Sequence, residues 1–254
     1  MNRPLILISN DDGYDAKGIN DLAEMVRPYG DVVIVAPEGG RSGSAMAMTS
    51  AEPVRLRKIK EEPGLQVYAC TGTPCDCVKI AFHSVLTSPP DLVLGGINHG
   101  DNAAINVHYS GTMGVVLEGC LKHIPSIGFS SCKRESNADF SALRPYIQKI
   151  VQRVLADGLP PQVCLNVNFP VREEFNGMRM CRMDVGNWLK EWEERTDPRG
   201  RQYFWLTGYY EAGQPDDDST DRWALDHGYV AITPVQLDMT AYSAMERLKT
   251  SLMG

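Results

Sequence analysis

The sequence predicts an α/β fold with a doubly wound, mostly parallel sheet, followed by a C-terminal extension. Short β-branched runs alternate with amphipathic segments over the first two thirds of the chain, which is typical of parallel strands joined by helices. The strand-like runs are almost continuously apolar, as expected where helices cover both faces of a sheet. After about residue 170 this pattern stops. We therefore expect a core over residues 1–170 and an extension over residues 171–254.

The expected core contains six strands and at least three helices. The strands are predicted at residues 5–9, 31–36, 66–70, 91–95, 126–129 and 163–167. Between the first two, Ile19, Leu22 and Val26 recur at a spacing that places one apolar stripe on the sheet. A second helix begins with Thr73 as its N-cap and Asp76 in its first turn. The apolar residues of segment 143–154 predict a third helix.

The expected extension begins with an aromatic and charged arm. All four tryptophans lie in segment 188–223, and a Pro-Arg-Gly turn at 198–200 separates two stretches that are predicted to pair as a hairpin. Long hairpins are rarely stable alone, so we expect this arm to pack on a partner subunit. The alternative is an added sheet folded back on its own domain. A strand returning to the sheet near residue 230 and a helix at 241–252 complete the extension.

Composition and charge restrict the partners. The 254 residues carry a net charge of −7, which argues against a partner of polymeric nucleic acid held by its phosphates. An anionic substrate would therefore need a bound cation or a cluster of backbone amides. We find no secretion signal and no apolar run approaching the ~20 residues that span a membrane. The seven cysteines are scattered like reduced thiols, so we expect a cytoplasmic protein.

Four polar stretches follow predicted strands, and the first is "SNDDG" after the first strand. At a strand end that breaks into a glycine turn, the carboxylates of Asp11 and Asp12 can converge on one ion. Carboxylate ligands of this type suit Mg²⁺ or Mn²⁺ rather than zinc. The alternative is a solvated turn.

The second stretch is "APEGGRSGSAM". Its glycines permit close backbone approach, and Ser42 or Ser44 offers a hydroxyl to a metal or a phosphate. The stretch matches neither a P-loop nor a dinucleotide fingerprint. A merely flexible loop is the alternative.

The third stretch, "LVLGGINHGDN", carries Asn98, His99 and Asn102 after an aliphatic strand. Asn98 can supply a neutral oxygen to a cation. His99 is interpreted as a turn residue, or as a residue that contacts a metal ligand without binding the metal itself, because the sequence offers no histidine cluster around it.

The fourth stretch, "HYSGTMGVVLEGCL", places Ser110, Gly111 and Thr112 immediately before a helical run. Free amides at a helix N-terminus together with two hydroxyls suit a phosphate. An ordinary N-cap is the alternative. Taken together, the four stretches predict a metal-assisted phosphate-ester hydrolase in which water is the nucleophile.

Six motifs then resemble a known family. "ILISNDDGYDAKGI", "VVIVAPEGGRSGSA", "TGTPCDCV", "DLVLGGINHGDN", "YSGTMG" and "GYVAITPVQLDMT" look like the successive signatures of the SurE (survival protein E) nucleotidases. They run in order from the first strand to about residue 240. The resemblance implies a Rossmann-like core, an extension exchanged between subunits of a homodimer or homotetramer, and hydrolysis of nucleoside 5′-monophosphates, often of 3′-monophosphates too.

The resemblance also implies roles for individual residues. One divalent ion per subunit, Mg²⁺ or Mn²⁺, would be held by Asp11, Asp12, Ser42 and Asn98. The phosphate and substrate would be bound by Asn98, Asn102, Ser110, Gly111 and Thr112. Asp11 or Asp12 would orient or deprotonate the attacking water, a role that the sequence does not assign to one of them.

The chain departs from the family pattern at one position. Asn106 stands where an acid is usual, and His108 follows two residues later. A second hypothesis is therefore a nucleotide-binding regulatory protein with weak or no turnover. An aspartyl-phosphate phosphatase is disfavoured because "NDDG" lacks the D-x-D pattern. An EF-hand is excluded because "DDGYDAKGINDL" has no acid at its twelfth position.

Overall fold

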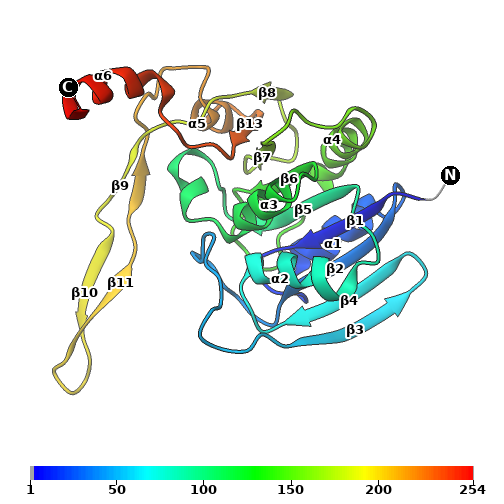
Figure 1. Cartoon of the computed structure of the whole chain (residues 1–254). Coiled ribbons are helices and arrows are strands. Elements are labelled where there is room, and N and C mark those ends of the chain that lie inside the picture. Colours follow the sequence, from blue (N-terminus) through cyan, green and yellow to red (C-terminus); the bar gives the residue numbers. More distant parts are fainter. Residues whose placement is uncertain (1–2, 254) are drawn as a thin grey trace.

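The computed structural model describes residues 3–253, and nine strands of this part form one sheet (Figure 1). The strand order is β3-β4-β2-β1-β5-β6-β7-β13-β8. Neighbouring strands run parallel except β3 with β4 and β13 with β7. The strands are β1 (Leu5–Ser9), β2 (Asp31–Pro37), β3 (Leu56–Glu62), β4 (Leu65–Cys70), β5 (Leu92–His99), β6 (Ser126–Ser131), β7 (Val163–Phe169), β8 (Met178–Met180) and β13 (Val230–Gln236). The predicted α/β class with a mostly parallel sheet is confirmed.

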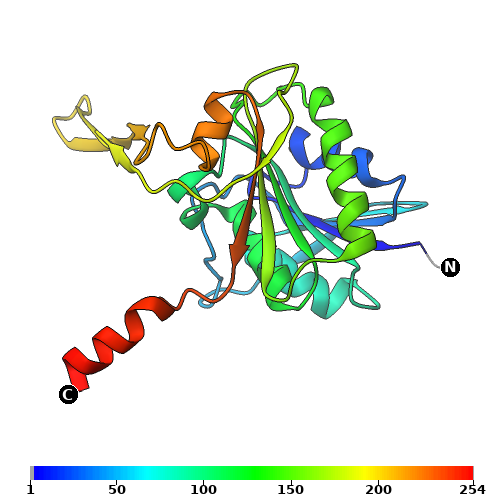
Figure 2. The same cartoon turned by 90° about the horizontal axis from the view of Figure 1, so that it is seen from above.

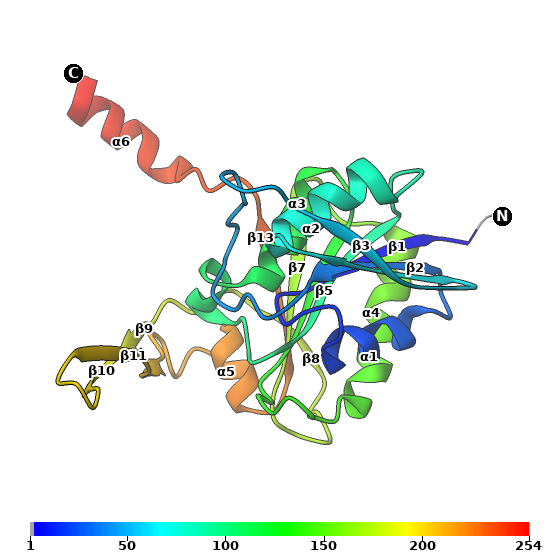
Figure 3. The ribbon, with the colours of Figure 1, turned by 90° about the horizontal axis from the view of Figure 1, so that it is seen from below.

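Helices cover both faces of the sheet, as the views from above and below show (Figures 2 and 3). α1 (Lys17–Val26) and α4 (Arg144–Asp157) lie on one face, and α2 (Pro74–Ile80) and α3 (Gly111–Leu121) lie on the other. Short helical turns occupy Ala81–Val85, Ala104–His108 and Ser141–Leu143. Within residues 3–253, none of the helices combines the length and the apolar character needed to cross a bilayer.

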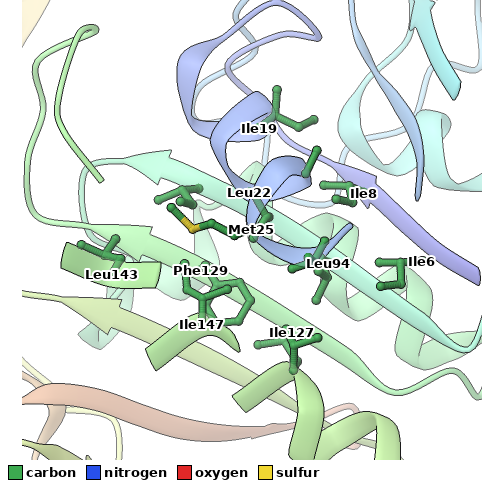
Figure 4. Close-up of a cluster of buried hydrophobic side chains, with 14 of the residues drawn as sticks. Ile6, Ile8, Ile19, Leu22, Met25, Leu94, Ile127, Phe129, Leu143 and Ile147 are labelled. Carbon is green, nitrogen blue, oxygen red and sulfur yellow. The ribbon is translucent and has the colours of Figure 1, made fainter. Parts of the chain in front are cut away.

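The larger core lies between the sheet and the face formed by α1 and α4 (Figure 4). Ile6 and Ile8 point to this face, whereas Leu7 between them packs on the opposite side, because side chains alternate along a strand. The α1 stripe is buried here, as its spacing predicts. The main contributors labelled in Figure 4 are Ile6, Ile8, Ile19, Leu22, Met25, Leu94, Ile127, Phe129, Leu143 and Ile147.

The N-cap predicted for α2 is confirmed. Thr73 Oγ1 accepts a hydrogen bond from the backbone N–H of Asp76 at 3.2 Å, and Asp76 Oδ2 accepts one from the N–H of Thr73 at 2.9 Å. This reciprocal capping box fixes where the helix begins. The α-helix ends at Ile80, and a wider π-helical turn continues over Ala81–Val85.

Two features differ from the sequence-based expectations. Strand β3 was not among the predicted strands, and it lies at the edge of the sheet, where its lysines and glutamates bury little. Strand β5 runs to His99 rather than ending at residue 95, with an irregularity in its pairing with β6 between Gly96 and Asn98. Asn98 therefore belongs to the end of a strand and not to a loop.

The extension contains the predicted hairpin. β10 (Trp192–Thr196) pairs antiparallel with β11 (Gln202–Leu206), and at its root β9 (Asn187–Leu189) pairs with β12 (Tyr209–Glu211). This arm, residues 187–211, projects from the body in Figures 1 and 2. The chain then returns through α5 (Asp221–Asp226) to β13, and α6 (Tyr242–Met253) has no buried residue. The domain division at residue 170 stays a prediction.

Candidate active site

A cavity of about 520 Å³ opens at the carboxyl end of the parallel strands, where this architecture binds ligands. It is lined by residues from the loops after β1 and β2, the end of β5 and the loop after it, the start of α3 and the arm. The structure thus brings together the four polar stretches that lie far apart in the sequence. Five of the predicted site residues line the cavity: Asp11, Ser42, Asn98, Asn102 and Ser110.

Asp11 lies just beyond β1 and is almost completely buried, with 4% of its surface exposed. Its Oδ1 accepts a hydrogen bond of 2.6 Å from Thr112 Oγ1. Its backbone carbonyl accepts a hydrogen bond of 2.7 Å from the N–H of Arg41, which holds the loop after β2 against the strand end. Burial raises the pKa of Asp11 to about 6, although the bond from Thr112 acts in the opposite direction.

Asp12 is half-buried behind Asp11, next to the end of β5. Its Oδ2 accepts a long hydrogen bond of 3.4 Å from the backbone N–H of His99. Burial raises the pKa of Asp12, and the neighbouring His99 lowers it by a smaller amount. The His99 ring lies 2.9 Å from the carbonyl of Glu135 through Nδ1 and packs edge-on against Phe140. His99 thus orients Asp12 through the backbone.

The loop after β2 brings two serines to the site. Ser42 is exposed and lines the cavity, whereas Ser44 Oγ is buried and has no hydrogen-bond partner within residues 3–253. The start of α3 approaches both Asp11 and Ser44 closely, because Gly111 has no side chain. A Cβ atom at Gly111 would lie 2.7 Å from Asp11 Cβ and 2.9 Å from Ser44 Oγ. Only glycine lets the start of α3 pack against both residues.

The start of α3 combines capping with access to the cavity. Ser110 lines the cavity and also caps the helix, because its hydroxyl accepts a hydrogen bond of 3.0 Å from the N–H of Met113. Thr112 is completely buried, and its hydroxyl donates to Asp11. The capping alternative therefore holds for Ser110, and Thr112 acts on the carboxylate of Asp11 rather than facing the open cavity.

Asn98 and Asn102 differ in what their side chains contact. Asn98 Nδ2 donates to the carbonyl of Gly100 at 2.7 Å, which leaves its side-chain oxygen as the atom that can face a cation. Asn102 is buried, and its Nδ2 donates to Ser130 Oγ at 2.8 Å while its backbone N–H donates to Asn168 Oδ1. Asn102 therefore fixes the loop after β5 to β6 and β7.

The polar groups of the site fit a hard divalent cation. Asp11 and Asp12 are adjacent carboxylates with raised pKa values, and within residues 3–253 neither forms an ion pair with lysine or arginine. A bound cation would lower both pKa values and favour the ionised form of each carboxylate. The described residues contain no group of three or more His, Cys, Asp and Glu that could bind a metal. Neutral oxygens of serine and asparagine would have to complete the ligand set.

Sequence reasoning missed several lining residues. Asp101 and Tyr109 lie inside stretches that it singled out, and Arg134 follows the end of β6, so their position beside strand ends was a usable signal. Trp188 and Glu191 come from the arm. Their place in the site depends on how the arm docks on the core, and no local pattern encodes that contact.

Comparison with known proteins identifies the family. The profile of the family described as "Survival protein SurE" matches residues 6–190. The chain belongs to the SurE family. It is 55% identical to the 5′-nucleotidase SurE of Phocaeicola vulgatus, over 97% of this chain and 96% of that protein. It is 54% identical to the 5′-nucleotidase SurE of Bacteroides thetaiotaomicron, over 97% and 95% of the two chains.

A solved SurE structure shares the fold. The crystal structure of the SurE protein from Aquifex aeolicus matches with a TM-score of 0.84 and 37% identity, over 98% of this chain and 99% of that one. The resemblance to SurE nucleotidases and the Rossmann-like α/β fold that it implies are therefore confirmed. The similarity extends through the arm and α6, because it covers nearly the whole chain.

Asn106, where the resemblance to the SurE family predicts an acid, lies in the wall of the cavity. Asn106 Oδ1 accepts a hydrogen bond of 2.9 Å from Trp188 Nε1, and Asn106 Nδ2 lies 3.3 Å from Asp101 Oδ1. Both ends of the carboxamide are therefore used by neighbouring side chains.

Proposed function

We propose that this chain is a 5′-nucleotidase that hydrolyses nucleoside 5′-monophosphates to nucleoside and phosphate in a reaction that depends on a divalent metal. The SurE relatives, named 5′-nucleotidases, support the nucleotidase activity. The single observation that supports the metal is the pair of neighbouring carboxylates of the buried Asp11 and the half-buried Asp12, which have no lysine or arginine partner in the described chain. Activity on 3′-monophosphates is part of the same proposal.

The metal ligands that we propose are Asp11, Asp12, Ser42 and Asn98, with one Mg²⁺ or Mn²⁺ per subunit. When bound, the ion supplies a Lewis acid for the phosphoryl oxygens and lowers the pKa of water. Ser44 is the alternative hydroxyl, because its oxygen is buried without a partner beside Asp11.

The reaction that we propose is an in-line attack of water on phosphorus. Asp11 or Asp12 orients the water and accepts its proton, and Thr112 holds Asp11 in place through the 2.6 Å hydrogen bond. The bond between phosphorus and the ester oxygen breaks, and the leaving oxygen takes a proton from solvent to become the nucleoside hydroxyl. The aspartate returns the proton that it accepted to solvent, which balances the step. Ser110, with the backbone of Gly111, binds the phosphoryl oxygens at the start of α3.

The geometry at Asn106 favours turnover over the binding-protein hypothesis. An acid that acted on the substrate from this position would have to present a free oxygen to the cavity. Instead, Asn106 bonds to Trp188 on one side and to Asp101 on the other. This position therefore shapes the wall, and Asp11 and Asp12 supply the carboxylates of the reaction.

The assembly and the location complete the proposal. Several aromatic residues of the arm are more than half exposed in one subunit, among them Trp192, Phe204 and Trp205. We propose that they are covered in a homodimer or homotetramer. The seven free cysteines support the proposed cytoplasmic location.

The test of this function compares binding with turnover in one sample. The metal-loaded protein is titrated with 5′-AMP in a calorimeter, and the released phosphate is then measured. A nucleotidase releases phosphate and leaves adenosine. Binding of AMP without any phosphate release would instead establish the regulatory binding protein.

A further inference from the structure

We propose that Trp188, at the root of the arm, is the surface on which the nucleobase stacks, and that Asn106 is the positioning residue that holds its indole ring. The inference rests on the proposed nucleotidase function and adds the residue that recognises the base. The cavity is lined by two different parts of the chain. The core supplies the polar end around Asp11, Asn98 and Ser110, whereas the arm supplies the wall that contains Trp188.

The two ends of this cavity suit the two ends of a nucleotide. The carboxylates can bind a metal ion, and the start of α3 can bind a phosphate. Trp188 places an aromatic side chain in the wall of the cavity, and stacking on aromatic side chains is how proteins bind bases without reading their edges. Tyr109 also lines the cavity, but it is 59% exposed, whereas Trp188 is half-buried and anchored through its ring nitrogen.

Trp188 belongs to a closed ring of five side chains. Trp188 Nε1 donates to Asn106 Oδ1 at 2.9 Å, and Asn106 Nδ2 lies 3.3 Å from Asp101 Oδ1. Arg222 Nη1 donates to the same Asp101 oxygen at 3.1 Å. The Arg222 guanidinium lies 5.5 Å from the Tyr210 ring, and the Tyr210 ring meets Trp188 edge-on at 6.2 Å. Each side chain contacts the next, and the last returns to Trp188.

This ring comes from separate parts of the chain. Asp101 and Asn106 follow β5, whereas Trp188 and Tyr210 face each other across the β9–β12 pair. Arg222 lies in α5. The indole is therefore fixed through its nitrogen and by its contact with the Tyr210 ring before any ligand arrives, so binding a base would require little further ordering of the wall.

A carboxamide suits position 106 better than a carboxylate does. Asn106 offers an oxygen to the indole N–H and an N–H to the carboxylate of Asp101. The opposite orientation of the amide would place donor against donor and acceptor against acceptor. An aspartate at 106 would place two carboxylates side by side, which repel each other. The departure from the usual SurE pattern is thus explained by the neighbours of Asn106 in this chain.

The test compares two substrates that differ only in the base. AMP and ribose 5-phosphate present the same phosphate and sugar, so the ratio of their kcat/KM values measures recognition of the base. In Trp188→Ala we expect this ratio to fall by about tenfold or more, mostly through a higher KM for AMP. The matched control is Tyr242→Ala, an aromatic residue of α6 that is 64% exposed and lies outside both the arm and the cavity lining. A ratio in Trp188→Ala within twofold of the Tyr242→Ala value would overturn the proposal.

The role of Asn106 is tested by a double-mutant cycle. Asn106→Ala is expected to lower the AMP to ribose 5-phosphate ratio, and combining it with Trp188→Ala is expected to lower the ratio no further than Trp188→Ala alone. Losses that multiply would mean that Asn106 contacts the substrate directly, and the positioning role would be wrong. Asn106→Asp is expected to lower the ratio as well, because the carboxylate of Asp101 remains beside it.

Adenosine binding separates this inference from the proposed function. Stacking on Trp188 is expected to quench tryptophan fluorescence in the wild type and in Trp192→Phe, but not in Trp188→Phe. Quenching that persists in Trp188→Phe would overturn the inference, even if AMP is hydrolysed. Absence of phosphate release from both substrates would refute the nucleotidase, whereas the fluorescence result would still decide where the base binds.

Discussion

Asp11 and Thr112 are 101 residues apart in the sequence and share one hydrogen bond at the centre of the site. Burial makes the ionised form of Asp11 unfavourable in the metal-free protein, and the hydroxyl of Thr112 compensates only in part. The residue is therefore suited to a cation that neutralises it. The proposed metal site depends on this one residue, because burial disfavours the charge of Asp11 and a bound cation would stabilise it.

The first prediction concerns Asp11→Asn. The pKa of Asp11 is about 6 in the folded protein and 3.8 in the unfolded chain. The free energy of unfolding of the metal-free protein therefore falls by up to about 3 kcal/mol as the pH rises from below 3.8 to above 6. Asp11→Asn has no carboxyl group to ionise at this position, so its stability does not fall in this way. Without metal it should unfold at a higher temperature than wild type at pH 7, with about half the advantage at pH 5. It should also lose metal-dependent AMP hydrolysis.

Thermal unfolding of chelator-treated protein at both pH values measures this effect. Asp15→Asn, an exposed aspartate in the same loop, is the control. Added Mg²⁺ or Mn²⁺ should stabilise wild type and Asp15→Asn but not Asp11→Asn. If the metal stabilised all three proteins equally, Asp11 would not be a ligand of the metal.

The second prediction concerns Thr112. Thr112→Val keeps the shape of the side chain but removes the hydroxyl that donates to Asp11, whereas Thr112→Ser keeps the hydroxyl. We expect Thr112→Val to weaken metal affinity or kcat/KM by about 10- to 100-fold, as for other residues that orient a metal ligand. Titration of activity with metal measures the effect. If the valine and serine variants behave alike, the hydrogen bond is irrelevant to the site.

Residues that follow strands could be predicted as site residues from the sequence, whereas their mutual contacts could not. Asp11 stands out because an apolar run ends at it, and parallel strands end at one edge of the sheet. The bond from Thr112 and the contact of Trp188 with Asn106 join residues 101 and 82 positions apart. Such pairs depend on the packing of α3 and the arm, which no local spacing reveals.

At the scale of elements, the third prediction concerns the start of α2. Thr73 caps the helix, and its hydroxyl also donates to the carbonyl of Ala47 at 2.7 Å. Thr73→Ala should destabilise the protein by about 1 kcal/mol and lower its melting temperature by about 2–4 °C. Thr87→Ala, at an exposed threonine, is the control. Equal melting temperatures for the two variants would contradict the capping role.

The elements also show where pattern reasoning works. The apolar stripe of α1 and the capping box of α2 are local signals, and both predicted their helices. In α3 every residue from Gly111 to Cys120 is buried, so the helix has no polar face and shows no stripe. β3 was missed for the opposite reason, because an edge strand rich in lysine and glutamate buries little.

At the scale of the whole molecule, the arm is the part that one subunit leaves uncovered. Trp205 is 62% exposed on β11, opposite Glu193 on β10. The fourth prediction is that light scattering at micromolar concentration gives at least twice the subunit mass of 28.1 kDa. Trp205→Asp should shift the protein toward monomer, because it places a charge in the apolar contact.

The control for this variant is Gln152→Asp, which adds the same charge at an exposed position of α4. It should leave the assembly unchanged. A mass near 28.1 kDa for the wild type would contradict the proposed role of the arm.

Metal dependence is tested by phosphate release from AMP by the purified, chelator-treated protein, with and without added Mg²⁺ or Mn²⁺, in parallel with Asp11→Asn. We predict release by the wild type only when metal is added, and no release by the variant under either condition. Undiminished release in the absence of metal, or most of the activity retained by Asp11→Asn, would contradict a metal-dependent nucleotidase site built on Asp11.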